Sequence, residues 1–141
     1  MSRKESRENV FKILYQADIQ KCLAGDLLEN FFAENTLPEK DKEYIEEIVT
    51  GVDKNIEFID DMLSKALKSW TLNRISKIDK AILRLALYEV MYKDDVPDSI
   101  AIFEAVELVK KYNTESAGGF VNGTLRAIAR KKDGGGEKSE N

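Results

Sequence analysis

The sequence predicts an all-α fold: a compact bundle of about six or seven helices arranged in two packed helical subdomains. Apolar residues recur with a period near 3.6 in almost every segment, which is typical of amphipathic helices. Two prolines and eight glycines in 141 residues are too few for the frequent turns of an all-β chain. With 43% hydrophobic and 34% charged residues, the composition is that of a soluble globular domain.

The first predicted helix begins at Ser2, which starts a capping-box pattern, and ends before Gly25. A second covers about residues 26–34. Pro38 suits the first turn of a third helix, whose apolar stripe continues beyond a bend or break around residues 51–55.

Residues 67–75 are predicted to form an irregular link. The helix predicted for 76–92 has an apolar face wide enough to be covered from two sides. Another helix follows at 97–112, and after a polar link at 113–116 a last helix runs to about residue 132. The charged, glycine-containing segment 133–141 is predicted to be a disordered tail.

We therefore expect one domain over residues 1–132, with an N-terminal half at about 1–68 and a C-terminal half at about 69–132. The two halves are expected to share one core through the helix at 76–92.

Several function classes are excluded by composition. The chain has no histidine, so Ser-His-Asp and Cys-His nucleophilic systems and histidine-bearing zinc sites cannot form. It also lacks a phosphate-binding glycine loop of either common type. We expect no catalytic residues, no metal and no cofactor. A single cysteine, Cys22, and the lack of a signal or membrane-spanning segment favour a cytoplasmic protein without membrane contact.

Charge is unevenly distributed along the chain. Residues 26–63 hold twelve acidic side chains against three lysines, whereas 1–21, 64–95 and 126–141 are each net basic. Either the basic residues only solvate helix faces, or the fold gathers some of them into a surface for a polyanion.

The basic group at the N-terminus comprises Arg3, Lys4 and Arg7. Cations in the first turns of a helix oppose its macrodipole, so stability alone does not explain them. Arg3 and Arg7 lie one turn apart on the same face, a spacing that suits contacts to phosphates or bases. The alternative is a frayed terminus whose charge has little effect on stability.

A glycine-rich segment, residues 118–123, surrounds Phe120 near the start of the last helix. Glycine lowers helix propensity, so helix formation alone does not explain why glycines occur at these positions. They either leave helix-start amides and the aromatic ring free for an anion and a base, or permit tight helix packing with Phe120 in the core.

Several blocks in order resemble the NusB family of bacterial transcription antitermination factors, over about residues 3–130. No single block is specific, but together they are. The blocks are Arg7 with Leu14-Tyr15-Gln16 and Asp18, then Gly51-Val52 with Asn55, residues 78–89, Asp95-Val96-Pro97, residues 101–108, and Phe120-Val121-Asn122-Gly123 with Leu125.

The resemblance implies an all-helical protein that binds the boxA segment of ribosomal RNA leader transcripts. Binding would occur together with NusE, a small-subunit ribosomal protein, within an antitermination complex on RNA polymerase that acts in rRNA transcription. The RNA-binding residues it implies are Arg3, Lys4, Arg7, Phe120 and Asn122. We expect the cationic side chains to meet beside the opening turn of the last helix.

The same resemblance places Tyr15, Asp79 and Tyr88 towards NusE. Some members of the family self-associate, so a homodimer is a further expectation. The chain departs from strongly basic relatives at Glu5, which interrupts the basic run.

Two rival interpretations remain at this level. A similar helical domain precedes the catalytic domain of some ribosomal RNA cytosine methyltransferases, but such a module requires an α/β domain after it, and the sequence ends at Asn141 in a polar tail. The other is a helical protein-interaction module that dimerises through residues 76–92 and does not bind RNA.

Overall fold

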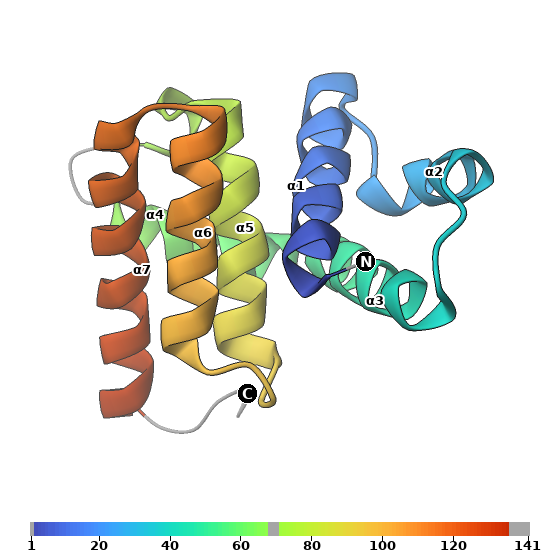
Figure 1. Ribbon diagram of the computed structural model, residues 1–141. Helices are drawn as coiled ribbons and strands as arrows, with labels where there is room; N and C mark the ends of the chain where they lie inside the picture. The colour runs from blue at the N-terminus through green and yellow to red at the C-terminus, as the bar shows by residue number, and fades with distance from the viewer. Residues whose placement is uncertain (1, 68–70, 136–141) are drawn as a thin grey trace.

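The computed structural model describes residues 2–67 and 71–135. This part of the chain is all-α, as predicted, and contains no strand. Figure 1 shows its helices, which are α1 (Arg3–Gln20), η1 (Ala24–Leu27), α2 (Leu28–Glu34), α3 (Glu39–Lys54), α4 (Ile56–Ala66), η2 (Leu72–Arg74), α5 (Lys77–Tyr92), α6 (Asp98–Tyr112) and α7 (Glu115–Gly135); the η elements are short 3-10 helices.

Side-chain caps start α1 and α5. The Ser2 hydroxyl accepts from the Glu5 amide at 3.1 Å, and the Glu5 carboxylate accepts from the Ser2 amide at 2.9 Å, which completes the predicted capping box. At α5 the Ser76 hydroxyl accepts from the Asp79 amide at 3.0 Å. Both helix starts were recognisable from sequence because capping depends on residues three positions apart.

Helix α1 ends earlier than the sequence predicts. Lys21 takes a left-handed conformation, with φ of 60°, directly after Gln20. The Asp53 carboxylate of α3 then accepts from the amides of Ala24 and Gly25 at 3.0 and 2.7 Å. A tertiary contact, and not the glycine alone, therefore sets where the chain turns.

The bend or break predicted around residues 51–55 falls at Asn55, between α3 and α4. Beyond it, α4 packs on α5 and α7, so it lies with the C-terminal helices (Figure 1). Residues 56–66, which belong to the predicted N-terminal half at about 1–68, thus pack mainly on the C-terminal helices. The link expected there includes residues 68–70, which lie outside the described residues.

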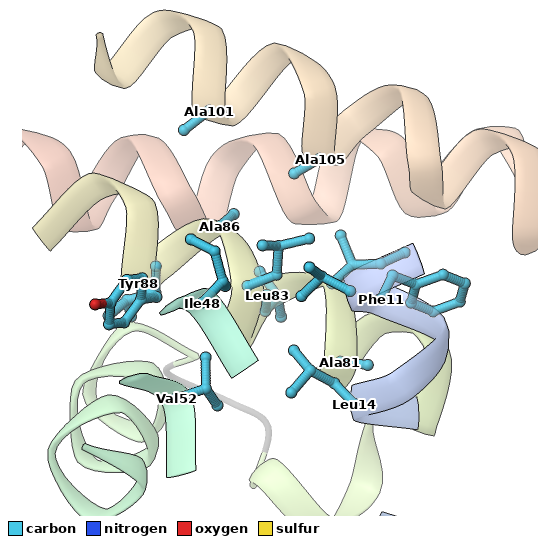
Figure 2. Packing of buried hydrophobic residues seen from close by; sticks show 14 of the residues in the cluster. Phe11, Leu14, Ile48, Val52, Ala81, Leu83, Ala86, Tyr88, Ala101 and Ala105 are labelled. Carbon is cyan, nitrogen blue, oxygen red and sulfur yellow. The ribbon is translucent and has the colours of Figure 1, made fainter. Parts of the chain in front are cut away.

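Helix α5 lies at the centre of the molecule. It contacts α1 and α3 on one side and α6 and α7 on the other, and α4 as well. Figure 2 shows Leu83 and Ala86 of α5 among side chains of α1, α3 and α6. Because its apolar residues are covered within the chain, α5 offers no free apolar face. A dimer through residues 76–92, as in the rival interpretation, would therefore have no exposed apolar face of α5 to use.

The last helix is longer than predicted at both ends. It begins at Glu115, inside the expected link, where the Thr114 hydroxyl accepts from the Ala117 amide at 3.1 Å. It continues through Gly135, so the tail predicted from residue 133 starts too early, and residues 136–141 lie outside the described part. None of the described helices is long and apolar enough to cross a membrane.

Candidate nucleic-acid interface

The first turn of α1 presents two exposed cations. Arg3 and Lys4 directly follow the Ser2 cap, and both side chains are exposed. The capping box satisfies amides of this turn and places the Glu5 carboxylate near the positive helix end. The cap therefore counters the unfavourable placement of the two cations, and a defined first turn replaces the frayed terminus that the sequence also allowed.

Arg3 lies over an aromatic ring of another helix. Its guanidinium is 4.0 Å from the ring centroid of Tyr44 in α3, a cation–π contact. The ammonium of Lys93 lies 5.9 Å from the same centroid. Arg3, Tyr44 and Lys93 line a cavity of about 340 Å³, together with Pro97 and Ile100. We call it the basic cavity, because an anion with an attached flat or apolar group would meet Arg3 and an apolar wall there, although the carboxylate of Asp95 also lines it and lies 3.6 Å from Lys93.

Arg7 also lines the basic cavity, but its guanidinium is buried and paired. Nε and Nη2 donate to the two carboxylate oxygens of Glu89 at 2.8 and 3.1 Å. Burial by itself would lower the pKa of Arg7, but the hydrogen bond and the charge of Glu89 raise that pKa above its ordinary value. Arg7 therefore stays charged, and its charge is countered inside the protein.

Phe120 and Asn122 lie in the first turns of α7. Phe120 is half-buried and lines a second cavity, of about 350 Å³, with Arg74, Asp79 and Asn113. Asn122 is also half-buried, and its side-chain oxygen accepts from Arg126 at 3.2 Å. We call this second cavity the aromatic cavity; an arginine and an aromatic ring line it, beside the carboxylate of Asp79.

The glycines around Phe120 have different surroundings. A Cβ at Gly118 would come within 3.1 Å of the Lys110 side chain of α6, which agrees with tight helix packing there. A Cβ at Gly119 or Gly123 would meet nothing within 4 Å. Helix packing therefore accounts for Gly118. Gly119 and Gly123 have no close neighbour, so they leave the backbone of α7 exposed at those positions.

The basic and aromatic cavities share no lining residue. Figure 1 shows α5 and α6 between α1 and α7. The expected meeting of the N-terminal cations with the opening turn of the last helix is therefore wrong, and the cation beside Phe120 is Arg74. The sequence prediction failed because it assigned no direction to α7 relative to α1.

The surface between α1 and the end of α6 carries further cations. Glu8 accepts from Lys111 at 2.7 Å and from the hydroxyl of Tyr112. Lys12 lies 5.9 Å from the ring centroid of Tyr112. Asn113, the residue after Tyr112, lines the aromatic cavity. The surface formed by Glu8, Lys12 and Lys111 therefore extends from α1 to that cavity.

The three residues predicted to face a protein partner lie on two helices, α1 and α5. Tyr15 is half-buried on α1, with its ring centroid 6.1 Å from that of Phe11. Asp79 accepts from Asn113 at 2.9 Å, and Tyr88 stacks on Tyr92 at 5.0 Å. Asp79 and Tyr88 lie nine positions apart on α5, which is roughly half a turn out of phase at 3.6 residues per turn. The two side chains therefore lie on opposite sides of α5, and their contact with a partner stays a prediction.

Sequence reasoning missed Tyr44, Lys93 and Arg74. Each comes from an element distant in sequence from the residue it joins, so no local motif could have indicated it. Within the described residues, no three potential metal ligands are grouped as a metal site requires.

The two cavities lie on a helical fold of a known class, that of bacterial transcription antitermination factors. The chain belongs to the NusB family, whose model matches residues 4–130. It is 45% identical over 141 residues to the transcription antitermination protein NusB of Acetivibrio thermocellus, covering 100% of this chain and 97% of the relative. It is likewise 45% identical to NusB of a Thermoanaerobacter species, over 99% of this chain and 97% of that protein.

Solved structures agree with this assignment. T. maritima NusB superposes with a TM-score of 0.87 at 39% identity, covering 93% of this chain and 92% of that one. A chain from a structure of the antitermination factors NusB and NusE in complex with double-stranded RNA has a TM-score of 0.84 at 30% identity, covering 92% of this chain and 97% of that one.

Proposed function

We propose that this protein is a transcription antitermination factor that binds the boxA RNA of ribosomal RNA leaders together with NusE. It would act by binding, without catalysis or a cofactor, as part of a complex on RNA polymerase in the cytoplasm. The observation that carries the proposal is the basic cavity, where exposed Arg3 lies on Tyr44 next to Lys93 in a chain of the NusB family. The relative solved with NusE and RNA supports both partners.

The proposed mechanism has two parts. Arg3 and Lys4 supply salt-dependent attraction to phosphates, whereas the Lys93 ammonium is paired with Glu47 at 3.0 Å and with Asp95 at 3.6 Å. Phe120, with Arg74 in the lining of the same cavity, is a platform for an unstacked base of a single strand. The protein carries a net charge of −4 and exposes few cations at the basic cavity, so RNA binding by the protein alone is expected to be weak. NusE would extend the RNA surface and tighten binding.

Arg3→Ala/Lys4→Ala tests the proposal in a titration of labelled boxA RNA against a scrambled RNA, with and without NusE. We expect preference for boxA, tighter binding with NusE, and affinity that falls steeply with salt. The double variant should weaken binding and reduce the slope of log K against log salt by up to about 0.7 for each lost contact to a single strand.

Lys54→Ala/Lys65→Ala is the matched control, since it removes two exposed cations from α3 and α4 outside both cavities. Neutralising the exposed acids Glu43 and Glu57 serves as a second control. Equal losses from all these variants, or equal affinity for boxA and scrambled RNA, would contradict the proposal. Gel filtration over a range of concentrations would identify the rival interaction module as a dimer that RNA leaves unchanged.

A further inference from the structure

Arg7, Glu89 and Tyr44 form one buried cluster from three helices. The Arg7 fork occupies both oxygens of the Glu89 carboxylate at 2.8 and 3.1 Å. The Tyr44 hydroxyl donates to the same carboxylate at 2.8 Å. The Arg7 and Glu89 side chains are 7% and 1% exposed, so the pair is removed from solvent. The cluster thereby ties α1 to α3 and α5 near the start of the chain.

Tyr44 connects this cluster to the exposed cation. Its hydroxyl binds Glu89, while its ring carries the Arg3 guanidinium at 4.0 Å. Arg3 and Arg7 are one turn apart on α1, so a shift of Arg7 moves the turn that bears Arg3. The side chains therefore form a continuous sequence of contacts, Arg7 to Glu89 to Tyr44 to Arg3.

Arg7 is poorly placed to bind a phosphate itself. Turning its guanidinium to an external anion would leave Glu89 buried without its cation, which is strongly unfavourable. The charge of Glu104 on α6 also acts on Arg7. The exposed cation of this turn that meets the basic cavity is Arg3.

We propose that Arg7 is a positioning residue, which through Glu89 and Tyr44 holds Arg3 towards the RNA and makes no phosphate contact of its own. This inference rests on the RNA-binding function proposed above. It reverses the role that the sequence pattern indicated for Arg7, and it assigns Glu89 and Tyr44 to the function although neither is exposed.

The test is a double-variant cycle of Arg7→Lys and Arg3→Gln, read in boxA affinity and in its salt slope. Lysine keeps the charge of Arg7 but loses the two-pronged contact to Glu89. We expect Arg7→Lys to weaken RNA binding at least about threefold, the size of effect seen for coupled neighbours. Its salt slope should become shallower, as in Arg3→Gln, and the double variant should bind no worse than Arg3→Gln alone.

Arg130→Lys, the same exchange at an exposed position of α7, is the matched control and should bind as the unaltered protein does. Circular dichroism verifies that each variant is folded at the temperature of the titration. Wild-type affinity and slope in folded Arg7→Lys, or losses that add in the double variant, would overturn the inference and leave the RNA-binding function intact. Arg3→Gln without effect on RNA would overturn both.

Glu89→Gln provides a second route if Arg7→Lys does not fold. The amide retains the shape of the side chain but releases the charge of Arg7. A phosphate-binding Arg7 would then bind RNA more tightly and with a steeper salt slope. A positioning Arg7 loses its charged partner, so we expect weaker binding, and tighter binding would refute the inference.

Discussion

Glu89 is an acidic residue with 1% exposure in the most buried helix of the protein. Burying an ion pair costs solvation that the attraction between its partners only offsets when the geometry is good and the remaining oxygens are hydrogen-bonded. The two contacts from Arg7 and the donation from Tyr44 meet that condition. Burial and the nearby carboxylate also raise the pKa of Tyr44, so its hydroxyl remains a donor at neutral pH.

Asp18 on α1 shows how charge acts at a less buried position. Lys77 and Lys80 of α5 lie 3.3 and 3.2 Å from the same carboxylate oxygen, and Arg84 lies 3.9 Å from the other. Burial alone would raise the pKa of Asp18, but the hydrogen bond and charge of Lys80, with those of its neighbours, lower it below its ordinary value. The ionised form is therefore favoured in the folded protein.

A lowered pKa of Asp18 gives a definite pH dependence of stability. Its contribution is fully present above the pKa of the unfolded chain, about 3.9, and is lost as pH falls through the lower folded value. Asp18→Asn should reduce the stability at neutral pH and flatten the decline below about pH 4. Urea unfolding midpoints across acidic pH measure this. Parallel pH profiles of the variant and the unaltered protein would contradict the assignment.

At the scale of elements, one glycine lets two helices approach. A Cβ at Gly51 of α3 would overlap the ring of Tyr88 on α5, whereas one at Gly123 of α7 would meet nothing within 4 Å. Packing α3 this closely on α5 holds the carboxylate of Glu89 within reach of Tyr44. The close approach of these helices thus connects the half-buried Gly51 to the basic cavity.

Gly51→Ala should destabilise the protein by about 1–3 kcal/mol, the usual effect of overpacking. Gly123→Ala is its matched opposite and should stabilise by about 0.5–1 kcal/mol, because alanine has the higher helix propensity and the space is free. Unfolding free energies from urea titration measure both. Changes of the same sign at the two positions would show that helix propensity, and not the contact with Tyr88, decides the effect.

At the scale of the whole molecule, α5 belongs to one core that includes residues from α1 through α7. Its central Leu83, Leu85 and Leu87 are each at most 2% exposed. The N-terminal helices that carry Arg3 and Tyr44 therefore pack on the same helix as α6 and α7. A shared core of this kind couples the stability of both parts.

Leu83→Ala should lower the unfolding free energy by about 2–5 kcal/mol, because it leaves a cavity at a fully buried position. Hydrogen exchange followed by mass spectrometry should show the loss of protection in α3 and in α6 alike, if the molecule opens as one cooperative unit. Loss confined to peptides of the C-terminal helices would show instead that the two parts unfold independently.

Most helices could be predicted because their signals are local. Ser2 and Ser76 act on residues three positions away, and Pro97 directly precedes the first residue of α6. Predictions failed where a distant contact decided the outcome. Asp53 holds the turn at Ala24 and Gly25 that follows α1, and the grouping of α4 depends on the surfaces of α5 and α7.

The candidate site divides in the same way. Arg3 and Lys4 could be selected from sequence, because exposed cations at a helix start have no local stabilising role. The roles of Arg7 as an RNA contact, and of Tyr15, Asp79 and Tyr88 as partner residues, stay predictions. The sequence could not supply Tyr44 and Lys93, which reach the basic cavity from α3 and from the end of α5.

The amino-acid sequence by itself determined the all-helical class, most helix starts and membership of the NusB family, since periodicity, caps and ordered motifs are properties of neighbouring residues. Only the tertiary structure decided which cations remain available to bind an anion. Arg3 and Arg7 are both cations in the first turns of the same helix. The guanidinium of Arg7, however, is buried and hydrogen-bonded to the carboxylate of Glu89, 82 positions away, which balances its charge. A charge's availability depends on what the fold packs against it, and that is not a local property.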